Sequence, residues 1–331
     1  MSKHKLSKRM HITIVSVVAI VFMMVILLHK NPFANPGDEL IKKCIAAVII
    51  MVSLVLYAVL YEKIIVLPAE LYQNRKLIWK LAKNDFKTRF AGSYLGIVWA
   101  FVQPVVTILV YWVVFEKGLN AKAEVLANGV EAPYVLWLTA GIVPWFYFSE
   151  ALSNGTTALL EYNYLVKKVV FKISILPIIK IIAATFIHGF FVLFMLLLFM
   201  VHGYFPDAHT LQLIYFSFCL FVFVLGISYT TCSIVLFFRD LTQIIGIVLQ
   251  VGMWATPILW KLSMVPEQYQ ILFKLNPVFY IVNGYRSALL EKTWFWEDFY
   301  STMFFWITTA VIFGIGTLIF KRLKVHFADV L

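Results

Sequence analysis

Long apolar runs constrain this sequence more than any other feature. A helix needs roughly 20 apolar residues to cross about 30 Å of hydrocarbon, because each residue adds only ~1.5 Å. Runs of about this length lie at Ile12–Leu28, Cys44–Leu67, Tyr94–Phe115, Tyr134–Leu152, Ile178–Val201, Leu211–Phe237, Thr242–Trp260 and Thr302–Phe320. We therefore predict an all-α integral membrane protein with about eight transmembrane helices.

The composition agrees with a membrane protein. Hydrophobic residues make up 62% of the 331-residue chain and charged residues only 14%. A soluble domain is nearer half apolar and a quarter charged, so lipid is the simplest place for this much apolar surface. A net charge of +11 would suggest nucleic acid in a soluble protein, but here it indicates basic cytoplasmic loops. We expect no nucleic-acid partner.

The placement of Lys and Arg predicts the orientation. If the N-terminus lies in the cytoplasm, the inner segments carry roughly twice as many basic residues as the outer ones. This predicts a multi-pass protein of the cytoplasmic membrane with both termini in the cytoplasm. No cleavage site follows the first apolar run, so we expect a retained anchor helix rather than a signal peptide.

Metal, disulfide and nucleotide sites are not indicated. Cys44, Cys219 and Cys232 lie in or beside apolar runs and form no CxxC pair. The sequence has no GxxxxGK[ST] loop to hold nucleotide phosphates. We therefore expect no cofactor and no metal in this chain.

One apolar region is interrupted by proline. Pro257, Pro266 and Pro277 divide Met253–Leu290 into pieces too short to cross a bilayer. Short pieces of this kind are typical of re-entrant or interfacial helices. We predict such helices on the outer side of the membrane.

The stretch 71–93 has the pattern of an amphipathic helix. At about 100° per residue, four lysines fall on one side: Lys76, Lys80, Lys83 and Lys87. Apolar residues fall on the other side: Ile78, Leu81, Ala82, Phe86 and Phe90. We predict a helix on the inner membrane surface, where its lysines would meet anionic lipid or an acidic partner.

Asp85 and Arg89 depart from this pattern, because both fall in the middle of the apolar side. They are four residues apart with the acid first, the order that favours an ion pair within a helix. One hypothesis is therefore a structural pair that neutralises itself against a neighbouring helix. The other is that Arg89 binds an anionic headgroup, which suits its fork of donors, and that Asp85 orients it.

Three groups of motifs carry a family resemblance. They are Asp85–Trp99 followed by Pro104; then Gly141–Trp145, Asn163–Lys168 and Phe171–Pro177; then Phe238–Leu241, Thr256–Ile258, Asn276-Pro277 and Tyr285-Arg286. In this order and spacing they resemble the type-2 ABC exporter permeases that move O-antigens, capsules and teichoic acids. The resemblance covers roughly residues 75–331.

The chain also departs from that family. Its members usually have six transmembrane helices, whereas residues 1–70 here add two more. The family often has Phe-Pro where this chain has Phe171-Lys172. Together with the apolar runs and the amphipathic pattern, the resemblance predicts three parts: two additional helices in 1–70, a cytoplasmic interface helix in 71–93, and a six-helix exporter domain in 94–331.

The resemblance also implies partners. The chain would be a permease and not an enzyme, and a separate ABC ATPase subunit would bind ATP and Mg. Two permease copies would work with two ATPases. The substrate would be a polyprenyl-pyrophosphate-linked polysaccharide, moved through a membrane whose lipids surround the complex.

Candidate site residues follow from these roles. The headgroup and entrance candidates are Asp85, Lys87 and Arg89. Aromatic faces bind sugars with little geometric demand, and the candidate channel aromatics are Tyr111, Trp112, Trp145, Phe146, Tyr147, Trp254 and Trp260. Their ordinary role would be the aromatic belt at the membrane interface or packing between helices. The candidate ATPase-coupling residues are Lys80, Lys83, Glu161, Asn163, Lys167, Lys168, Phe171, Arg239 and Asp240.

Two polar residues inside the runs have simpler interpretations. His188 predicts a hydrogen bond between helices more readily than a proton relay. Glu150 lies near the inner end of its run and is placed to pair with a basic group.

Three alternatives remain open on sequence grounds. A membrane-embedded glycosyl- or acyltransferase would need convergent acids, a histidine base or a metal, and the acids here are scattered. An ion-coupled secondary transporter predicts matching interrupted helices in two halves, and only one interrupted segment is present. A small-molecule exporter of the same fold is disfavoured by the aromatic richness and the motif at Arg89–Trp99.

Overall fold

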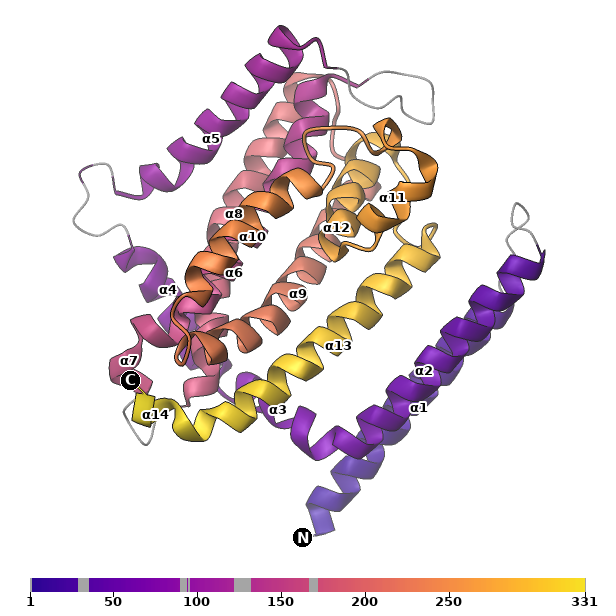
Figure 1. The fold of residues 1–331 in the computed structure, drawn as a ribbon, viewed down its shortest axis with the longest axis vertical. Coiled ribbons are helices and arrows are strands. Elements are labelled where there is room, and N and C mark those ends of the chain that lie inside the picture. Colours follow the sequence, from indigo (N-terminus) through magenta and orange to yellow (C-terminus); the bar gives the residue numbers. More distant parts are fainter. Residues whose placement is uncertain are drawn as a thin grey trace. The chain divides into compact units, whose positions relative to one another are not determined.

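The computed structural model describes residues 2–28, 36–89, 94, 96–121, 132–166 and 172–330, and this part of the chain is built from helices without a strand (Figure 1). It divides into two compact units, residues 1–69 and 70–331. The boundary falls within the short helix α3 (Val66–Gln73).

The first unit is a pair of long helices. Helices α1 (Ser2–Leu28) and α2 (Pro36–Ile64) lie side by side (Figure 1). A hydrogen bond of 2.6 Å joins Nδ1 of His11 on α1 to the hydroxyl of Tyr61 on α2. Most apolar side chains of α1 are exposed, which suits a helix surrounded by lipid.

The second unit contains the remaining helices. Its α-helices are α4 (Arg75–Thr88), α5 (Trp99–Tyr111), α6 (Tyr134–Glu161), α7 (Asn163–Val166), α8 (Leu176–Val201), α9 (Gln212–Val235), α10 (Leu241–Ala255), α11 (Glu267–Lys274), α12 (Pro277–Arg286), α13 (Phe299–Leu323) and α14 (Phe327–Val330). Two π-helical segments extend α5 and α12, over Trp112–Gly118 and Ser287–Glu291. Short 3₁₀ segments lie at Gly96–Val98, Ile173–Ile175, Ala208–Leu211, Leu262–Met264 and Lys324–His326.

Six helices in the described part of the chain are long and apolar enough to cross a membrane. They are Arg9–Leu28, Trp99–Gly118, Tyr134–Glu161, Ile173–Val201, Ala208–Val235 and Phe299–His326. Of the other two predicted spans, Cys44–Leu67 falls largely in the long helix α2, whose apolar part includes Lys43–Val59, and Thr242–Trp260 corresponds to the shorter helix Leu241–Ala255. The all-α membrane fold is thus confirmed, while α10 is shorter than its predicted run.

Helix α10 is short because of the residues that follow it. Thr256 has extended backbone angles (φ −93°, ψ 131°), as the residue before a proline usually does, and Pro257 comes next. The predicted run Thr242–Trp260 therefore ends as a helix at Ala255. The short helices α11 and α12 follow, so the prediction of short pieces in Met253–Leu290 is confirmed; their position on the outer side stays a prediction.

Helix α6 forms the centre of the second unit. It is the most buried of the six long helices and packs against α8, α9 and α12. The predicted helix–helix hydrogen bond of His188 is also confirmed. Its Nε2 on α8 lies 3.1 Å from the Ser217 hydroxyl on α9 and 3.0 Å from the Tyr285 hydroxyl on α12.

Helices α9 and α13 approach closely through glycine. A Cβ atom on Gly316 would lie 2.4 Å from the carbonyl oxygen of Gly226, and one on Gly226 would lie 3.0 Å from Cα of Phe313. Small residues let two helix backbones approach in this way.

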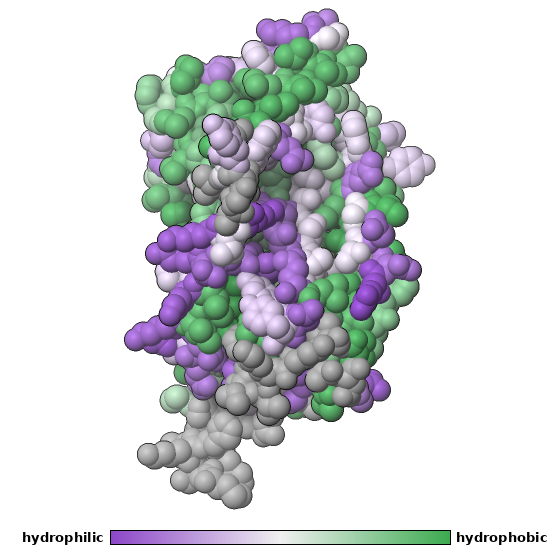
Figure 2. All heavy atoms as spheres, turned by 90° about the vertical axis from the view of Figure 1, so that its left-hand side faces the viewer, coloured by the Kyte–Doolittle hydropathy of each residue, from purple (hydrophilic) through white to green (hydrophobic). Residues whose placement is uncertain are grey.

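Helix α4 has the predicted amphipathic arrangement. Ile78 and Ala82 are buried. The rings of Trp79 and Phe86 each make a T-shaped contact with the ring of Phe186 on α8, at centroid distances of 5.4 Å. The four lysines Lys76, Lys80, Lys83 and Lys87 are exposed. On the side where α4 lies, Figure 2 shows hydrophilic side chains gathered below a broad hydrophobic area.

Candidate functional site

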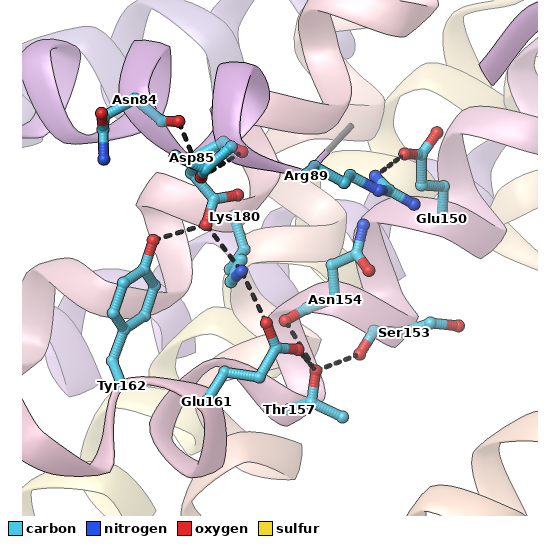
Figure 3. A network of polar contacts seen from close by, with 11 residues as sticks. Asn84, Asp85, Arg89, Glu150, Ser153, Asn154, Thr157, Glu161, Tyr162 and Lys180 are labelled. Atoms are coloured by element: carbon cyan, nitrogen blue, oxygen red, sulfur yellow. Dashed lines mark hydrogen bonds and ion pairs between the residues drawn. The ribbon is translucent and has the colours of Figure 1, made fainter. Parts of the chain in front are cut away.

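A group of charged side chains lies where α4, α6 and α8 meet (Figure 3). Lys180 of α8 donates to the carboxylates of Asp85 on α4 and Glu161 at the end of α6, at 2.7 Å each. The Tyr162 hydroxyl also donates to Asp85, and the Lys180 ammonium lies 4.9 Å from the centre of the Tyr162 ring. We call Asp85, Glu161, Tyr162 and Lys180 the charged node.

The buried part of the charged node is the pair Asp85 and Lys180. The side chains of Asp85 and Lys180 are each only 11% exposed, whereas that of Glu161 is 50% exposed. Charges removed from water need close, well-directed partners, and Lys180 has two carboxylates. Burial raises the pKa of Tyr162, and its hydrogen bond to Asp85 raises that pKa further. Tyr162 therefore stays protonated and keeps its role as a donor.

Arg89 belongs to a second ion pair. Its guanidinium donates to the carboxylate of Glu150 on α6, and the two side chains are 39% and 21% exposed (Figure 3). The predicted pairing of Glu150 with a basic group is confirmed. The hypothesis that Asp85 and Arg89 pair with each other is wrong, because Asp85 faces Lys180 on α8 while Arg89 reaches α6. Their position on the apolar side of α4 was nonetheless the signal that both face other helices.

A cavity of about 710 Å³ adjoins the Arg89–Glu150 pair. It lies among α5, α6, α8 and α10, and its lining residues include Arg89, Trp99, Gln103, Trp145, Phe146, Glu150, Asn154, Ile187, Leu249 and Gln250. An arginine fork beside aromatic and amide side chains can bind a phosphate group together with an apolar or sugar ring. Trp99 was part of the sequence motif but was not among the channel candidates.

The structure does not bring the seven candidate channel aromatics together. Trp145 and Phe146 line the cavity. Tyr147 points into the core instead, 2.9 Å from the Thr185 hydroxyl and stacked on His188. The others lie at helix ends: Tyr111 and Trp112 where α5 becomes a π-helix, and Trp254 and Trp260 around the end of α10.

A buried arginine brings several of the sequence motifs into contact. Arg286 is 5% exposed, and its guanidinium donates to the carbonyls of Pro257 (2.7 Å), Ile258 (2.9 Å) and Trp137 (3.3 Å). It also lies 3.5 Å over the ring of Trp137. A Cβ atom on Gly141 would lie 2.6 Å from the guanidinium, so only glycine leaves room for it.

Asn276 completes this arrangement. Its side-chain carbonyl accepts from the backbone N–H of Val278 at 3.0 Å, which caps α12, and its amide donates to the Thr256 hydroxyl at 2.9 Å. The motifs Gly141–Trp145, Thr256–Ile258, Asn276-Pro277 and Tyr285-Arg286 thus meet around the break after α10. Their main effect here is structural, because they satisfy backbone groups that the break leaves without helical partners.

Comparison with known proteins identifies the family. The ABC-2 type transporter family matches residues 76–290, from α4 to the π-helix after α12. The chain belongs to the ABC-2 type transporter family. Membership implies an ABC ATPase as a separate subunit.

Individual ABC-2 relatives resemble most of the chain. It is 28% identical over 227 residues to the O-antigen export system permease protein RfbA of Myxococcus xanthus, covering 68% of this chain and 84% of that protein. A protein of the same name from Klebsiella pneumoniae is 26% identical over 260 residues, covering 77% and 95%. The polysialic acid transport protein KpsM of Escherichia coli is 24% identical over 217 residues, covering 62% and 78%. All three are named as export or transport proteins, which does not favour the transferase alternative.

The coupling candidates of this ABC-2 protein lie in different places. Lys80 and Lys83 are on the exposed side of α4, as is the headgroup candidate Lys87. Glu161 belongs to the charged node, and Asn163 begins α7 directly after it. Arg239 and Asp240 form an exposed turn before α10, and neither makes an ion pair within the described residues. Lys167, Lys168 and Phe171 lie outside the described residues.

The described part of the ABC-2 chain contains no cluster of three His, Cys, Asp or Glu side chains that could hold a metal ion. Lys180, the residue that joins Asp85 to Glu161, was not singled out from the sequence. It lies inside the predicted run Ile178–Val201, only four residues after the start of α8. A lysine inside a long apolar run was the available signal.

Proposed function

We propose that this chain is the membrane permease of an ABC exporter for a lipid-linked polysaccharide of the O-antigen, capsule or teichoic-acid class. The similarity to permeases with O-antigen and polysialic acid names supports this substrate class. The single observation that carries the proposal is the cavity of about 710 Å³, which places an arginine beside aromatic side chains among spanning helices. Such a surface suits an anionic headgroup joined to sugars and an apolar lipid.

In this proposal Arg89 binds the pyrophosphate of a polyprenyl carrier, while Glu150 holds the guanidinium in place until the phosphate arrives. Lys87, exposed on α4 two residues before Arg89, adds positive charge at the entrance. The rings of Trp99, Trp145 and Phe146 offer faces to sugar or lipid. A second copy of the chain would complete the channel, and both termini would lie in the cytoplasm.

The partner ATPase would bind ATP and Mg and supply the energy. It would meet the permease at the exposed lysines of α4 and at α7. Both helices adjoin the charged node, because α4 carries Asp85 and α7 begins directly after Tyr162. The node would then transmit contact with the ATPase to the spanning helices.

Purification from native membranes in mild detergent tests this function. We expect a P-loop ATPase at a stoichiometric ratio, ATP hydrolysis by the complex, and loss of a surface polysaccharide when the gene is deleted. Recovery of a homo-oligomer without an ATPase, with the surface polysaccharide unchanged, would exclude the exporter and favour a membrane transferase.

Charge reversal on α4 tests where the ATPase binds. We expect the double variant Lys80→Glu, Lys83→Glu to bind the ATPase about tenfold or more weakly, because it sets acidic side chains against an acidic partner surface. The measurement is the amount of ATPase that co-purifies with the tagged permease. The matched control is Lys261→Glu, Lys274→Glu near α11, which lies at the other end of the unit (Figure 1). Equal co-purification of both variants would place the contact elsewhere.

A further inference from the structure

The three helices of the charged node also contribute residues to the cavity: Arg89 at the end of α4, Glu150 on α6 and Ile187 on α8. Asp85 and Arg89 are one turn apart on α4, and they bind Lys180 on α8 and Glu150 on α6 respectively. Helix α6 also carries Glu161, the second partner of Lys180 (Figure 3). Helix α4 therefore cannot turn or slide against α6 and α8 without stretching one of these ion pairs.

Lys180 is the central member of this arrangement. It is the one cation in the charged node, and both of its carboxylate contacts are 2.7 Å long. It lies in the second turn of α8, and Ile187, two turns further along the same helix, lines the cavity. A displacement of α4 or of the end of α6 thus reaches the cavity wall through a rigid helix.

Stability alone does not account for a buried lysine at this position. Helix α4 already packs on α8 through Trp79, Phe86 and Phe186, as well as through buried aliphatic side chains. Replacing a buried ion pair by apolar residues of similar size is often neutral or stabilising. The charges instead fix the geometry, because Lys180 holds α4 and the end of α6 at set distances from α8.

We propose that Lys180 is a positioning residue that couples ATP hydrolysis to substrate movement. It holds α4, α6 and α8 together, so that the Arg89–Glu150 pair opens only when α4 is displaced. The proposal rests on the function proposed above, and it assigns to one residue the connection between the ATPase-facing surface and the cavity. It predicts that, when the charged node is lost, ATP hydrolysis continues while polysaccharide export falls.

The test uses the permease together with its co-purified ATPase in proteoliposomes, with ATP hydrolysis and polysaccharide export measured in parallel. In Lys180→Met, we expect hydrolysis to continue while the polysaccharide exported per ATP falls about tenfold, within the usual range of coupling between sites. Lys180→Arg should restore most of this ratio, because it keeps the charge. The control is Lys292→Met, which breaks the 3.1 Å ion pair with Asp207 far along the chain and should leave the ratio unchanged.

A triple variant separates coupling from folding. Asp85→Asn, Glu161→Gln, Lys180→Met leaves no unpaired charge in the node, so it should assemble even if Lys180→Met alone does not. If Lys180 is a coupling residue, the triple variant still exports little polysaccharide per ATP. A triple variant with the wild-type ratio would overturn the proposal and make the node purely structural. A wild-type complex that hydrolyses ATP but moves no polysaccharide would instead contradict the proposed function.

Discussion

Arg286→Met is expected to lower the free energy of unfolding by about 3 kcal/mol, because it leaves the carbonyls of Pro257 and Ile258 without their donor and removes a further hydrogen bond to the carbonyl of Trp137. The carbonyls of Pro257 and Ile258 lie in the break after α10, where no helical N–H replaces the lost donors. Pro257 and Ile258 are also buried, which leaves their carbonyls few other donors. Methionine preserves much of the side-chain volume, so the loss reports hydrogen bonds rather than a void.

The measurement is the apparent melting temperature of the detergent-purified protein, followed by the loss of its monodisperse peak in size-exclusion chromatography. We expect a clear decrease for Arg286→Met and a smaller one for Gly141→Ala, whose new Cβ atom would press on the same guanidinium. The control is Arg322→Met, an exposed arginine in the last turn of α13. Equal melting temperatures for Arg286→Met and Arg322→Met would show that water or other donors satisfy these carbonyls.

The fold was largely predictable because membrane helices are specified by local composition. A run of about 20 apolar residues needs no partner to be recognised, and the helical period alone separated the lysines of α4 from Ile78 and Ala82. The length of α10 was overestimated because hydropathy does not register the backbone restriction before Pro257.

The candidate site was predictable only in part, because its partners are distant in sequence. The position of Asp85 on the apolar side of α4 indicated that it faces another helix, but Lys180 lies 95 residues away. A spacing of four favoured the wrong partner, Arg89, because only neighbours within one helix can be judged from sequence. Arg286 was visible as a motif, whereas its contact with Pro257 depends on how α12 returns against α6.

Substitutions at the two members of the Arg89–Glu150 pair are expected to change substrate binding in opposite directions. Arg89→Ala should lower affinity for a polyprenyl-pyrophosphate lipid by about ten- to a hundredfold, the amount that charge-assisted hydrogen bonds to a phosphate supply. Glu150→Gln removes the carboxylate that competes with the phosphate for the guanidinium. It should raise the affinity about tenfold, since the phosphate no longer displaces a charged partner.

In Glu150→Gln, the rate of export should not rise together with the affinity for the lipid. Arg89→Ala is expected to export little because the headgroup is not captured. Glu150→Gln is expected to export more slowly than wild type although it binds more tightly, because Glu150 no longer helps the headgroup leave Arg89. Binding is measured with the purified permease in nanodiscs against undecaprenyl pyrophosphate, and export by surface polysaccharide in cells.

A structural role for the pair predicts a different result. Breaking a partly buried ion pair from either side leaves an unpaired charge or a weaker contact, so both variants would lose stability and bind the lipid less well. Arg89→Lys adds a further distinction, because a lysine keeps the charge but not the two parallel donors, and it should recover binding only in part. Parallel loss of binding in Arg89→Ala and Glu150→Gln, with lower melting temperatures for both, would remove the headgroup role from Arg89. Opposite changes at unchanged melting temperature would show that Glu150 and the substrate's phosphate compete for the Arg89 guanidinium.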